Sequence, residues 1–315
     1  MTGPSTLQLD VSRETGTDAF VDSSDTPIAA AAAAALRAAQ QHHSEPFPLP
    51  SERQVLCVAN QKGGVGKTTT AVNLAAALAL RGAEVVCIDL DPQGNASTGL
   101  GVEHPPGGPS VYDALIGGCP LQDVVVASAE IPGLACVPAT LDLAGAEIEL
   151  VAMPDREFRL RAAIERFESS AHYVIIDCPP SLGLLTLNAL CAAREVLIPI
   201  QCEYYALEGL GQLVSTIERV RAHLNPALDI GAIALTMFDG RTRLSEQVAQ
   251  EVQSHFGPRV LSTAVPRSVR LAEAPSYGRP VLTYDPASRG SIAYVEVARE
   301  LAARCARNDS RSEES

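Results

Sequence analysis

Long apolar runs are missing from this chain of 315 residues, and so is any surplus of positive charge. No run approaches the ~18 to 20 apolar residues that a membrane-spanning helix needs, and no basic region precedes an apolar one near the N-terminus. We therefore expect a cytoplasmic protein without membrane association. The net charge of −13 argues against a protein that binds nucleic acid over its whole surface, although it permits a local basic patch.

Cysteine pairs are missing as well. No C-x-x-C pair and no Cys/His spacing typical of a zinc site occurs in the sequence. The eight cysteines stand singly, and most lie inside apolar runs. We interpret them as reduced side chains that act as small apolar groups in the core.

Lysine is scarce: of the 24 basic side chains only Lys62 and Lys67 are lysines, and both lie in the segment 61–69, QKGGVGKTT. This glycine-rich segment stands between a strand-like run and a helix-like one, where backbone N–H groups and a helix N-terminus can surround a phosphate. The strict pattern G-x-x-x-x-G-K-[ST] fails at Gln61, and Lys62 is added near the front. A compact ammonium suits a point contact with phosphate, so we interpret both lysines as phosphate ligands. For Lys62 an ordinary solvated charge is the alternative.

Three aspartates follow two strand-like runs. Asp89 and Asp91 end the run that begins at residue 84, and they point to the same side of an extended backbone. One could orient an attacking water while the other assists Mg²⁺; a simple turn at Asp91 is the alternative. Asp177 ends the buried-looking run 173–177, which has the form of a Walker B element whose carboxylate holds Mg²⁺ directly or through water.

The chain divides by composition into three regions. Residues 1–50 form a polar, alanine-rich tail with a proline linker, which we expect to be disordered or partly helical, and residues 308–315 form a short polar tail. Between them, residues 51–307 alternate strand-like and helix-like segments. Strands are predicted at 54–60, 84–89, 134–138, 173–177, 195–201, 230–237 and 260–265. Helices are predicted near 68–81, 110–116, 156–169, 184–193, 207–224, 245–256 and 291–306. The alternation predicts an α/β fold, a mostly parallel central sheet with helices on both faces.

Several motifs occur in one order along this domain: KGGVGKTT (62–69), DLDPQGN (89–95), VIIDCPPS (174–181), QCEYYALEG (201–209) and VPRSVRLAEAPS (265–276). Together they resemble the ParA/Soj family, P-loop NTPases with a deviant Walker A motif that belong to the ParA/MinD superfamily. The resemblance covers roughly residues 53–306. It implies Mg²⁺-dependent hydrolysis of ATP to ADP and phosphate at a slow intrinsic rate that a partner stimulates.

The resemblance also implies roles for single residues. The catalytic candidates are Lys67 on the β/γ-phosphates, Lys62 reaching the partner's nucleotide in a sandwich dimer, and Asp91 positioning water. The metal candidates are Thr68, Asp89 and Asp177. The nucleotide-binding candidates are Lys62, Gly63, Gly64, Val65, Gly66, Lys67, Thr68 and Thr69 at the phosphates, and Pro266, Arg267 and Ser268 at the adenine. Ser268 departs from the family, in which Asn is common at this position.

The resemblance finally implies partners. An ATP-bound homodimer would bind double-stranded DNA of the nucleoid non-specifically through Arg241 and Arg270, and a ParB-like centromere-binding protein would release it by stimulating hydrolysis. For each arginine an ordinary surface charge is the alternative. In the tail, Arg13 and Arg37 are candidates to receive the stimulus, or the tail binds a polar scaffold protein.

Two other functions remain open at this stage. A MinD-like or other ParA-superfamily ATPase that positions a non-DNA cargo is one, but the segment 292–304 is predicted to dock on the core and not on a membrane. The other is a regulatory module that holds nucleotide without hydrolysing it, which the presence of Lys67, Thr68 and Asp91 argues against.

Overall fold

The computed structural model describes residues 45–204 and 206–313. The chain divides into two units, residues 1–45 and residues 46–315, and every element below belongs to the second. Arg13, Arg37 and nearly all of the predicted N-terminal tail therefore lie outside the described residues. Among the residues described, no helix combines the length and the apolar character that crossing a membrane requires.

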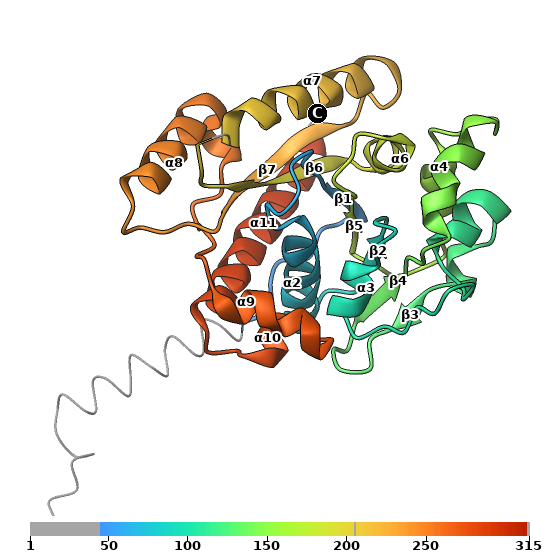
Figure 1. The fold of residues 1–315 in the computed structure, drawn as a ribbon, viewed down its shortest axis with the longest axis horizontal. Helices are drawn as coiled ribbons and strands as arrows, with labels where there is room; N and C mark the ends of the chain where they lie inside the picture. The colour runs from blue at the N-terminus through green and yellow to red at the C-terminus, as the bar shows by residue number, and fades with distance from the viewer. Residues whose placement is uncertain (1–44, 205, 314–315) are drawn as a thin grey trace, which may run out of the picture. The chain divides into compact units, whose positions relative to one another are not determined.

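A seven-stranded sheet forms the centre of the described part, in the order β3-β4-β2-β5-β1-β6-β7 (Figure 1). The strands are β1 (Gln54–Val58), β2 (Val85–Asp89), β3 (Val126–Ala127), β4 (Leu134–Val137), β5 (Tyr173–Asp177), β6 (Glu195–Gln201) and β7 (Asp229–Thr236). All neighbours pair in parallel except β3 with β4. Strands β2 and β5 are buried along their whole length, which is why they appear in the sequence as continuous apolar runs.

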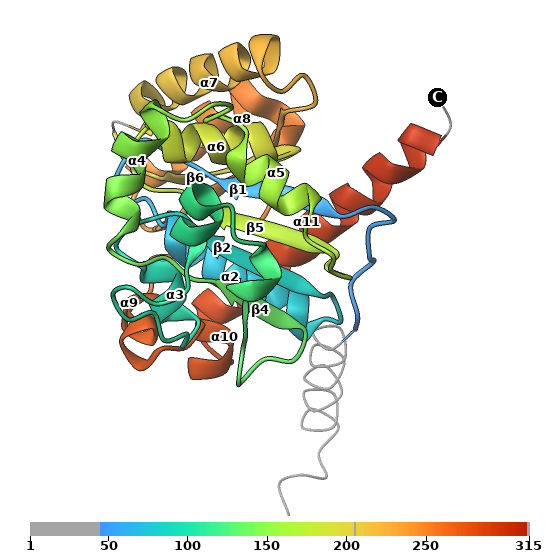
Figure 2. The ribbon, with the colours of Figure 1, turned by 90° about the vertical axis from the view of Figure 1, so that its right-hand side faces the viewer.

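Helices cover both faces of the sheet (Figures 1 and 2). One layer contains α2 (Lys67–Leu80), α3 (Asn95–Gly99), α9 (Val269–Glu273), α10 (Val281–Tyr284) and α11 (Arg289–Glu313), and the other contains α4 (Leu143–Val151), α5 (Arg159–Glu165), α6 (Leu184–Ala192), α7 (Ala206–His223) and α8 (Arg243–Phe256). Because side chains alternate along a strand, Leu56 and Val58 enter the core under the first layer, whereas Cys57 and Ala59 enter the core under the second. The predicted α/β architecture is confirmed.

The strand predicted at 260–265 is wrong. This segment follows β7 without forming a named strand. Isolated parallel bridges join Ile233 with Val260 and, just beyond the segment, Phe238 with Pro266, and the N–H groups of Leu261 and Val265 donate to carbonyls of β7 at 2.9 and 2.8 Å. Between them, the backbone N–H groups of Ser262 and Thr263 donate to the carboxylate of Glu300 on α11, at 2.7 and 2.8 Å. The Glu300 carboxylate thus holds the middle of the segment, and the pairing with β7 is interrupted there. The helix predicted at 291–306 is present but longer, because α11 continues to Glu313.

Candidate functional site

A glycine-rich loop connects β1 to α2 at the carboxyl edge of the sheet. Gly64 and Gly66 have φ angles of 75° and 89°, in the left-handed region that glycine adopts without strain. Gly66 occupies the N-cap position of α2, which begins at Lys67. The first N–H groups of this 14-residue helix therefore point into the loop, and they create positive potential where the phosphates are predicted.

Two neighbouring strands hold the loop in place. The side chain of Asn60 accepts a hydrogen bond from the Lys62 N–H at 3.0 Å and donates one to the carbonyl of Pro199, in β6, at 2.8 Å. Thr236, the last residue of β7, donates through its hydroxyl to the carbonyl of Val65 at 2.8 Å. The front and the back of the loop are thus each fixed by one buried polar side chain.

The two lysines of the loop have different environments. Lys67 is only 7% exposed, and its ammonium donates to the carbonyl of Lys62 at 3.0 Å. Burial lowers the pKa of Lys67, and the negative charge of Asp177 opposes that shift. Lys62 instead has a side chain that is 35% exposed and forms an ion pair with Glu203, which follows β6.

Asp89 is fully buried and organises the segment between β2 and α3. Its Oδ2 accepts from the N–H and the hydroxyl of Ser97, at 2.8 and 2.7 Å, and its Oδ1 accepts from the Asp91 N–H at 3.1 Å. Burial raises the pKa of Asp89 to about 6, although the hydrogen bonds from Ser97 favour the charged form. Because both carboxylate oxygens are already engaged, Asp89 could serve a metal ion most readily through water.

Asp91 lies just beyond this turn and is 9% exposed. Its Oδ1 accepts from the Gln93 N–H at 3.0 Å, which fixes the side chain. Its negative charge adds to the rise in the pKa of Asp177 and offsets part of the fall in the pKa of Lys67. The structure therefore brings the predicted catalytic acid together with the loop lysine and the Walker B acid.

Asp177 is completely buried at the end of β5, beside Asp89 of β2 in the strand register. Within residues 45–313 as described, neither carboxylate oxygen accepts a hydrogen bond of ordinary geometry. Burial raises the pKa of Asp177 well above its usual range and the charge of Asp89 adds to this, while the Thr68 hydroxyl and Lys67 favour the charged form. A buried carboxylate without a partner is costly, and a cation would satisfy it.

These residues fit a magnesium ion that completes its shell from a nucleotide. The described residues contain no group of three or more His, Cys, Asp and Glu side chains that could hold a metal ion. Thr68, in the first turn of α2, and Asp177 supply one hydroxyl and one carboxylate. Mg²⁺ commonly uses such a small set of protein oxygens together with phosphate oxygens and water.

A cavity of about 220 Å³ lies next to the loop. It brings the predicted adenine contacts Pro266, Arg267 and Ser268 together with Gly66 and Thr69. The remaining lining residues are Thr236, Met237, Val265, Leu271, Ala272 and Tyr294. The phosphate loop and a base-sized cavity are therefore adjacent, as a mononucleotide site requires.

The predicted DNA contacts, Arg241 and Arg270, lie outside this cavity. Arg241 is 90% exposed and donates to both carboxylate oxygens of Asp239, at 2.9 and 2.8 Å. Arg270 forms ion pairs with Glu273 at 2.9 Å and with Asp285 at 3.2 Å. Both are surface arginines with acidic neighbours.

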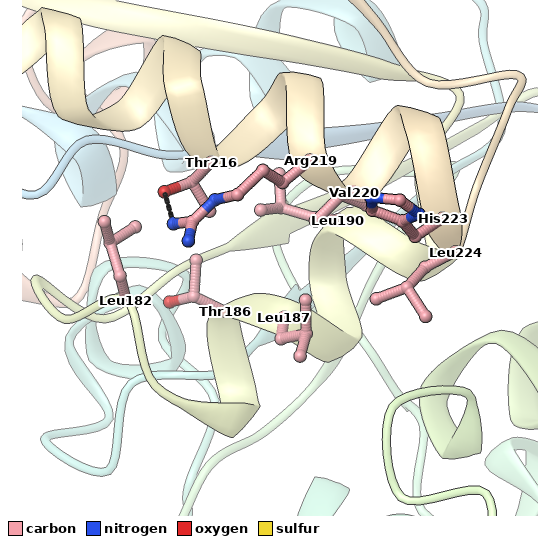
Figure 3. A pocket seen from close by; sticks show the side chains of 9 residues that line it. All are labelled: Leu182, Thr186, Leu187, Leu190, Thr216, Arg219, Val220, His223 and Leu224. Atoms are coloured by element: carbon pink, nitrogen blue, oxygen red, sulfur yellow. Dashed lines mark hydrogen bonds between the residues drawn. The ribbon is translucent and has the colours of Figure 1, made fainter.

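A second cavity, of about 370 Å³, lies between α6 and α7 and contains none of the candidate residues (Figure 3). Mostly apolar side chains line it, and Arg219 donates to the Thr216 hydroxyl at 3.4 Å beside it. Its lining residues are Leu182, Thr186, Leu187, Leu190, Thr216, Arg219, Val220, His223 and Leu224. Because neither acidic side chains nor a glycine-rich loop line this cavity, it is unsuited to a nucleoside triphosphate.

The parallel sheet, the glycine loop at its carboxyl edge and the buried Walker B acid define a P-loop ATPase. A family model described as an AAA domain matches residues 53–230. The chain is 54% identical over 253 residues to the chromosome partitioning protein ParA of Caulobacter vibrioides, covering 80% of this chain and 94% of that protein. It is 52% identical over 250 residues to the sporulation initiation inhibitor protein Soj of Bacillus subtilis, covering 79% and 98%. The chain therefore belongs to the ParA/Soj family of chromosome-partitioning ATPases.

Solved structures share this fold. The chain resembles a cobyrinic acid a,c-diamide synthase from Mycobacterium smegmatis with bound ADP and magnesium, at 39% identity and a TM-score of 0.68, over 78% of this chain and 93% of that one. It shares its fold with the septum site-determining protein MinD of Pyrococcus horikoshii complexed with Mg-ADP, at 24% identity and a TM-score of 0.66, over 79% and 96%. The family resemblance seen in the sequence is confirmed.

Proposed function

We propose that this chromosome-partitioning ATPase binds ATP with Mg²⁺ and closes into a sandwich homodimer. The dimer binds nucleoid DNA without sequence preference, and a ParB-like partner releases it by stimulating hydrolysis. The identity to ParA and Soj proteins over nearly their whole length supports this proposal.

The main support for this proposal is the difference between the environments of the two lysines. Lys67 is buried behind the loop, where it serves the nucleotide of its own chain. Lys62 stands at the front of the loop with a third of its side chain exposed. An ordinary phosphate loop needs only one lysine, so the second one is available to a nucleotide held by another subunit, in the manner of an arginine finger supplied in trans.

The other residues of the site bind the metal ion, the attacking water and the base. Thr68 and Asp177 would hold a magnesium ion, which would supply positive charge against the charge that develops on the phosphates. Asp91, fixed by the Gln93 N–H, orients the attacking water. Pro266 and Arg267 border the base in the cavity beside the loop. Because hydrolysis also depends on Lys62 of a second subunit, intrinsic turnover is slow.

The C-terminal helix favours a DNA cargo over a membrane-bound, MinD-like function. Val297, Leu301 and Cys305 of α11 are all buried, and they belong to the core cluster that also contains α2. The apolar side of this part of α11 is occupied by the protein's own core, so it is not presented to a lipid surface.

DNA binding measured with ATP, with ADP and without nucleotide, each over a range of salt concentrations, tests the proposal. We expect binding with ATP alone, and an affinity that falls steeply with salt. Equal binding in all three states would reject the ATP switch. No binding in any state would reject the DNA function and favour an ATPase that positions another cargo.

A further inference from the structure

The cavity of about 370 Å³ between α6 and α7 is separate from the nucleotide cavity, and within the described chain the two have no lining residue in common (Figure 3). Its volume falls in the range of small-molecule sites, about 300 to 1,000 Å³. Five of its nine lining residues are leucine or valine, and they come from both helices and from the segments beside them. Such a lining favours an apolar chain over a strongly hydrated ligand.

The two threonine hydroxyls of this cavity are already bound within the protein. Thr186, on α6, donates to the carbonyl of Ser181 at 2.6 Å. Thr216, on α7, donates to the carbonyl of Gln212 at 3.0 Å. Because these donors are used, the inner wall adds few hydrogen bonds for a ligand that is polar along its whole length.

The α7 side of the cavity carries the exposed side chains of Arg219 and His223. These two residues and Thr216 follow one another at spacings of three and four, so they share one face of the helix. Glu218 also belongs to α7 but does not line the cavity. Among the described lining residues there is no carboxylate, so the charge at this opening is positive.

Arg219 has no acidic partner in the part of the chain that the structure describes. Its guanidinium donates to the neutral Thr216 hydroxyl at 3.4 Å, the dashed contact in Figure 3. Two residues further along α7, Arg221 instead forms an ion pair with Asp229 at 3.3 Å. In a chain with a net charge of −13, an arginine without a carboxylate at the opening of an apolar cavity is a ready contact for an external anion.

We propose that this cavity binds a medium-chain fatty carboxylate, with its alkyl chain in the apolar interior and its carboxylate on Arg219. The proposal goes beyond the function proposed above, because it concerns a second ligand at a site separate from the nucleotide. A guanidinium binds a carboxylate through two parallel N–H···O bonds, which fixes the charged end of the ligand. The ligand bridges α7 to α6, the helix that follows the loop after Asp177 and is tied to that loop by the Thr186–Ser181 bond.

Titration calorimetry of the full chain with octanoate tests the proposal, with ADP and Mg²⁺ at saturation so that the nucleotide cavity is occupied. We expect one octanoate per chain. Hexanoate should bind about 15-fold more weakly, since each buried CH₂ changes the affinity about fourfold. Octanol, which keeps the chain but carries no charge, should bind about fivefold more weakly, the upper end for an exposed ion pair.

Two variants divide the charged contact from the apolar one. Arg219→Gln should lower the affinity for octanoate about fivefold and leave that for octanol unchanged, because only the ion pair is lost. Arg221→Gln is the matched control, since it removes the same charge from the same helix while Asp229 keeps its ion pair with Arg259 at 3.2 Å. Leu187→Trp fills the cavity from its half-buried position and should abolish binding of both ligands.

Circular dichroism of each variant confirms that it is folded before the titrations are compared. If octanoate does not bind the wild-type chain, or binds Leu187→Trp as tightly as the wild type, the cavity is not its site and the proposal is overturned. An equal loss of octanoate affinity in Arg219→Gln and Arg221→Gln would show a general effect of charge and reject Arg219 as the contact. None of these outcomes depends on DNA binding or on ATP hydrolysis, so the function proposed above is tested separately.

Discussion

Lys62 forms an ion pair with Glu203 of its own chain. In the proposed dimer the same ammonium reaches a nucleotide that the other subunit holds. Both side chains are 35% exposed, so the pair is partly screened by water. The structure therefore shows the lysine in an intramolecular contact that must open before it can act in trans.

Replacing Glu203 by glutamine should tighten ATP-dependent dimerisation. A partly exposed ion pair contributes about 0.2 to 1 kcal/mol, and each dimer releases two, so we expect a dimer dissociation constant about two- to thirtyfold lower. Sedimentation velocity with a slowly hydrolysed ATP analogue measures it. Glu52→Gln, which removes the surface pair with Arg194 (3.1 Å), is the control. Weaker dimerisation of Glu203→Gln would mean that Glu203 positions Lys62 for the partner and does not restrain it.

Replacing Lys62 by alanine should leave a folded monomer that binds nucleotide but neither dimerises nor hydrolyses ATP at the normal rate. The side chain contributes no buried contact to the core, and Lys67 remains in place behind the loop. Residues given in trans accelerate phosphoryl transfer by about 10³-fold or more, so the ATPase rate should fall by a similar factor. Sedimentation and phosphate release measure the two losses. Normal dimerisation together with normal hydrolysis would reject the role in trans.

Asp91→Asn should abolish hydrolysis while keeping ATP binding and dimerisation. The amide oxygen of asparagine can still accept the hydrogen bond from the Gln93 N–H, so the turn is kept and only the negative charge is lost. Positioning of a general base contributes about 10² to 10⁴ in rate, and we expect a loss in that range. Phosphate release, compared with binding of a fluorescent ATP analogue, separates the two effects. An unchanged ATPase rate would show that Asp91 forms a turn and nothing more.

The part of the site that could be predicted from the sequence is the part that short local motifs encode. The glycine loop and the acids at the ends of β2 and β5 are each encoded within a few neighbouring residues, and the parallel sheet brings those ends to one edge. Asn60 and Thr236 were missed because they act over long separations in sequence, 139 and 171 residues from the carbonyls they bind. Both stand at or just beyond the carboxyl end of a strand. A polar residue at that place is the sequence signal that could have identified them.

Prediction of the fold from the sequence was limited in a similar way. Helix α4 was not predicted, because its apolar residues face several directions: Leu143 and Leu150 are buried, whereas Ile148 is 78% exposed and Val151 is 58% exposed. A pattern of this kind hides the helical period on which prediction depends. At 260–265 the error is the opposite one, because a strand was predicted where the structure has none. The composition of this segment suits a sheet, but the carboxylate of Glu300, distant in sequence, binds its backbone.

Ser97→Ala should destabilise the nucleotide-free protein by an amount that grows with pH. Burial raises the pKa of Asp89 from an ordinary 3.8 to about 6, and the Ser97 hydrogen bonds limit that rise. The folded state therefore holds this proton more tightly than the unfolded state does. The stability of the folded state therefore falls as pH rises from about 4 to about 6. Above that range, the effect of Asp89 on stability no longer changes with pH.

Without the Ser97 hydroxyl, the pKa of folded Asp89 rises further, so the loss of stability continues to higher pH. A part that does not depend on pH, about 1 to 3 kcal/mol, is added because the buried Ala139 N–H loses the Ser97 oxygen as its acceptor at 3.1 Å. Urea unfolding at pH 5 and pH 8 measures both parts. Ser169→Ala, which removes a hydroxyl that accepts from the Ala171 N–H at 3.1 Å, is the control and should show no pH dependence. An equal destabilisation by Ser97→Ala at the two pH values would show that Asp89 does not change its charge in this range, and that Ser97 acts only through Ala139.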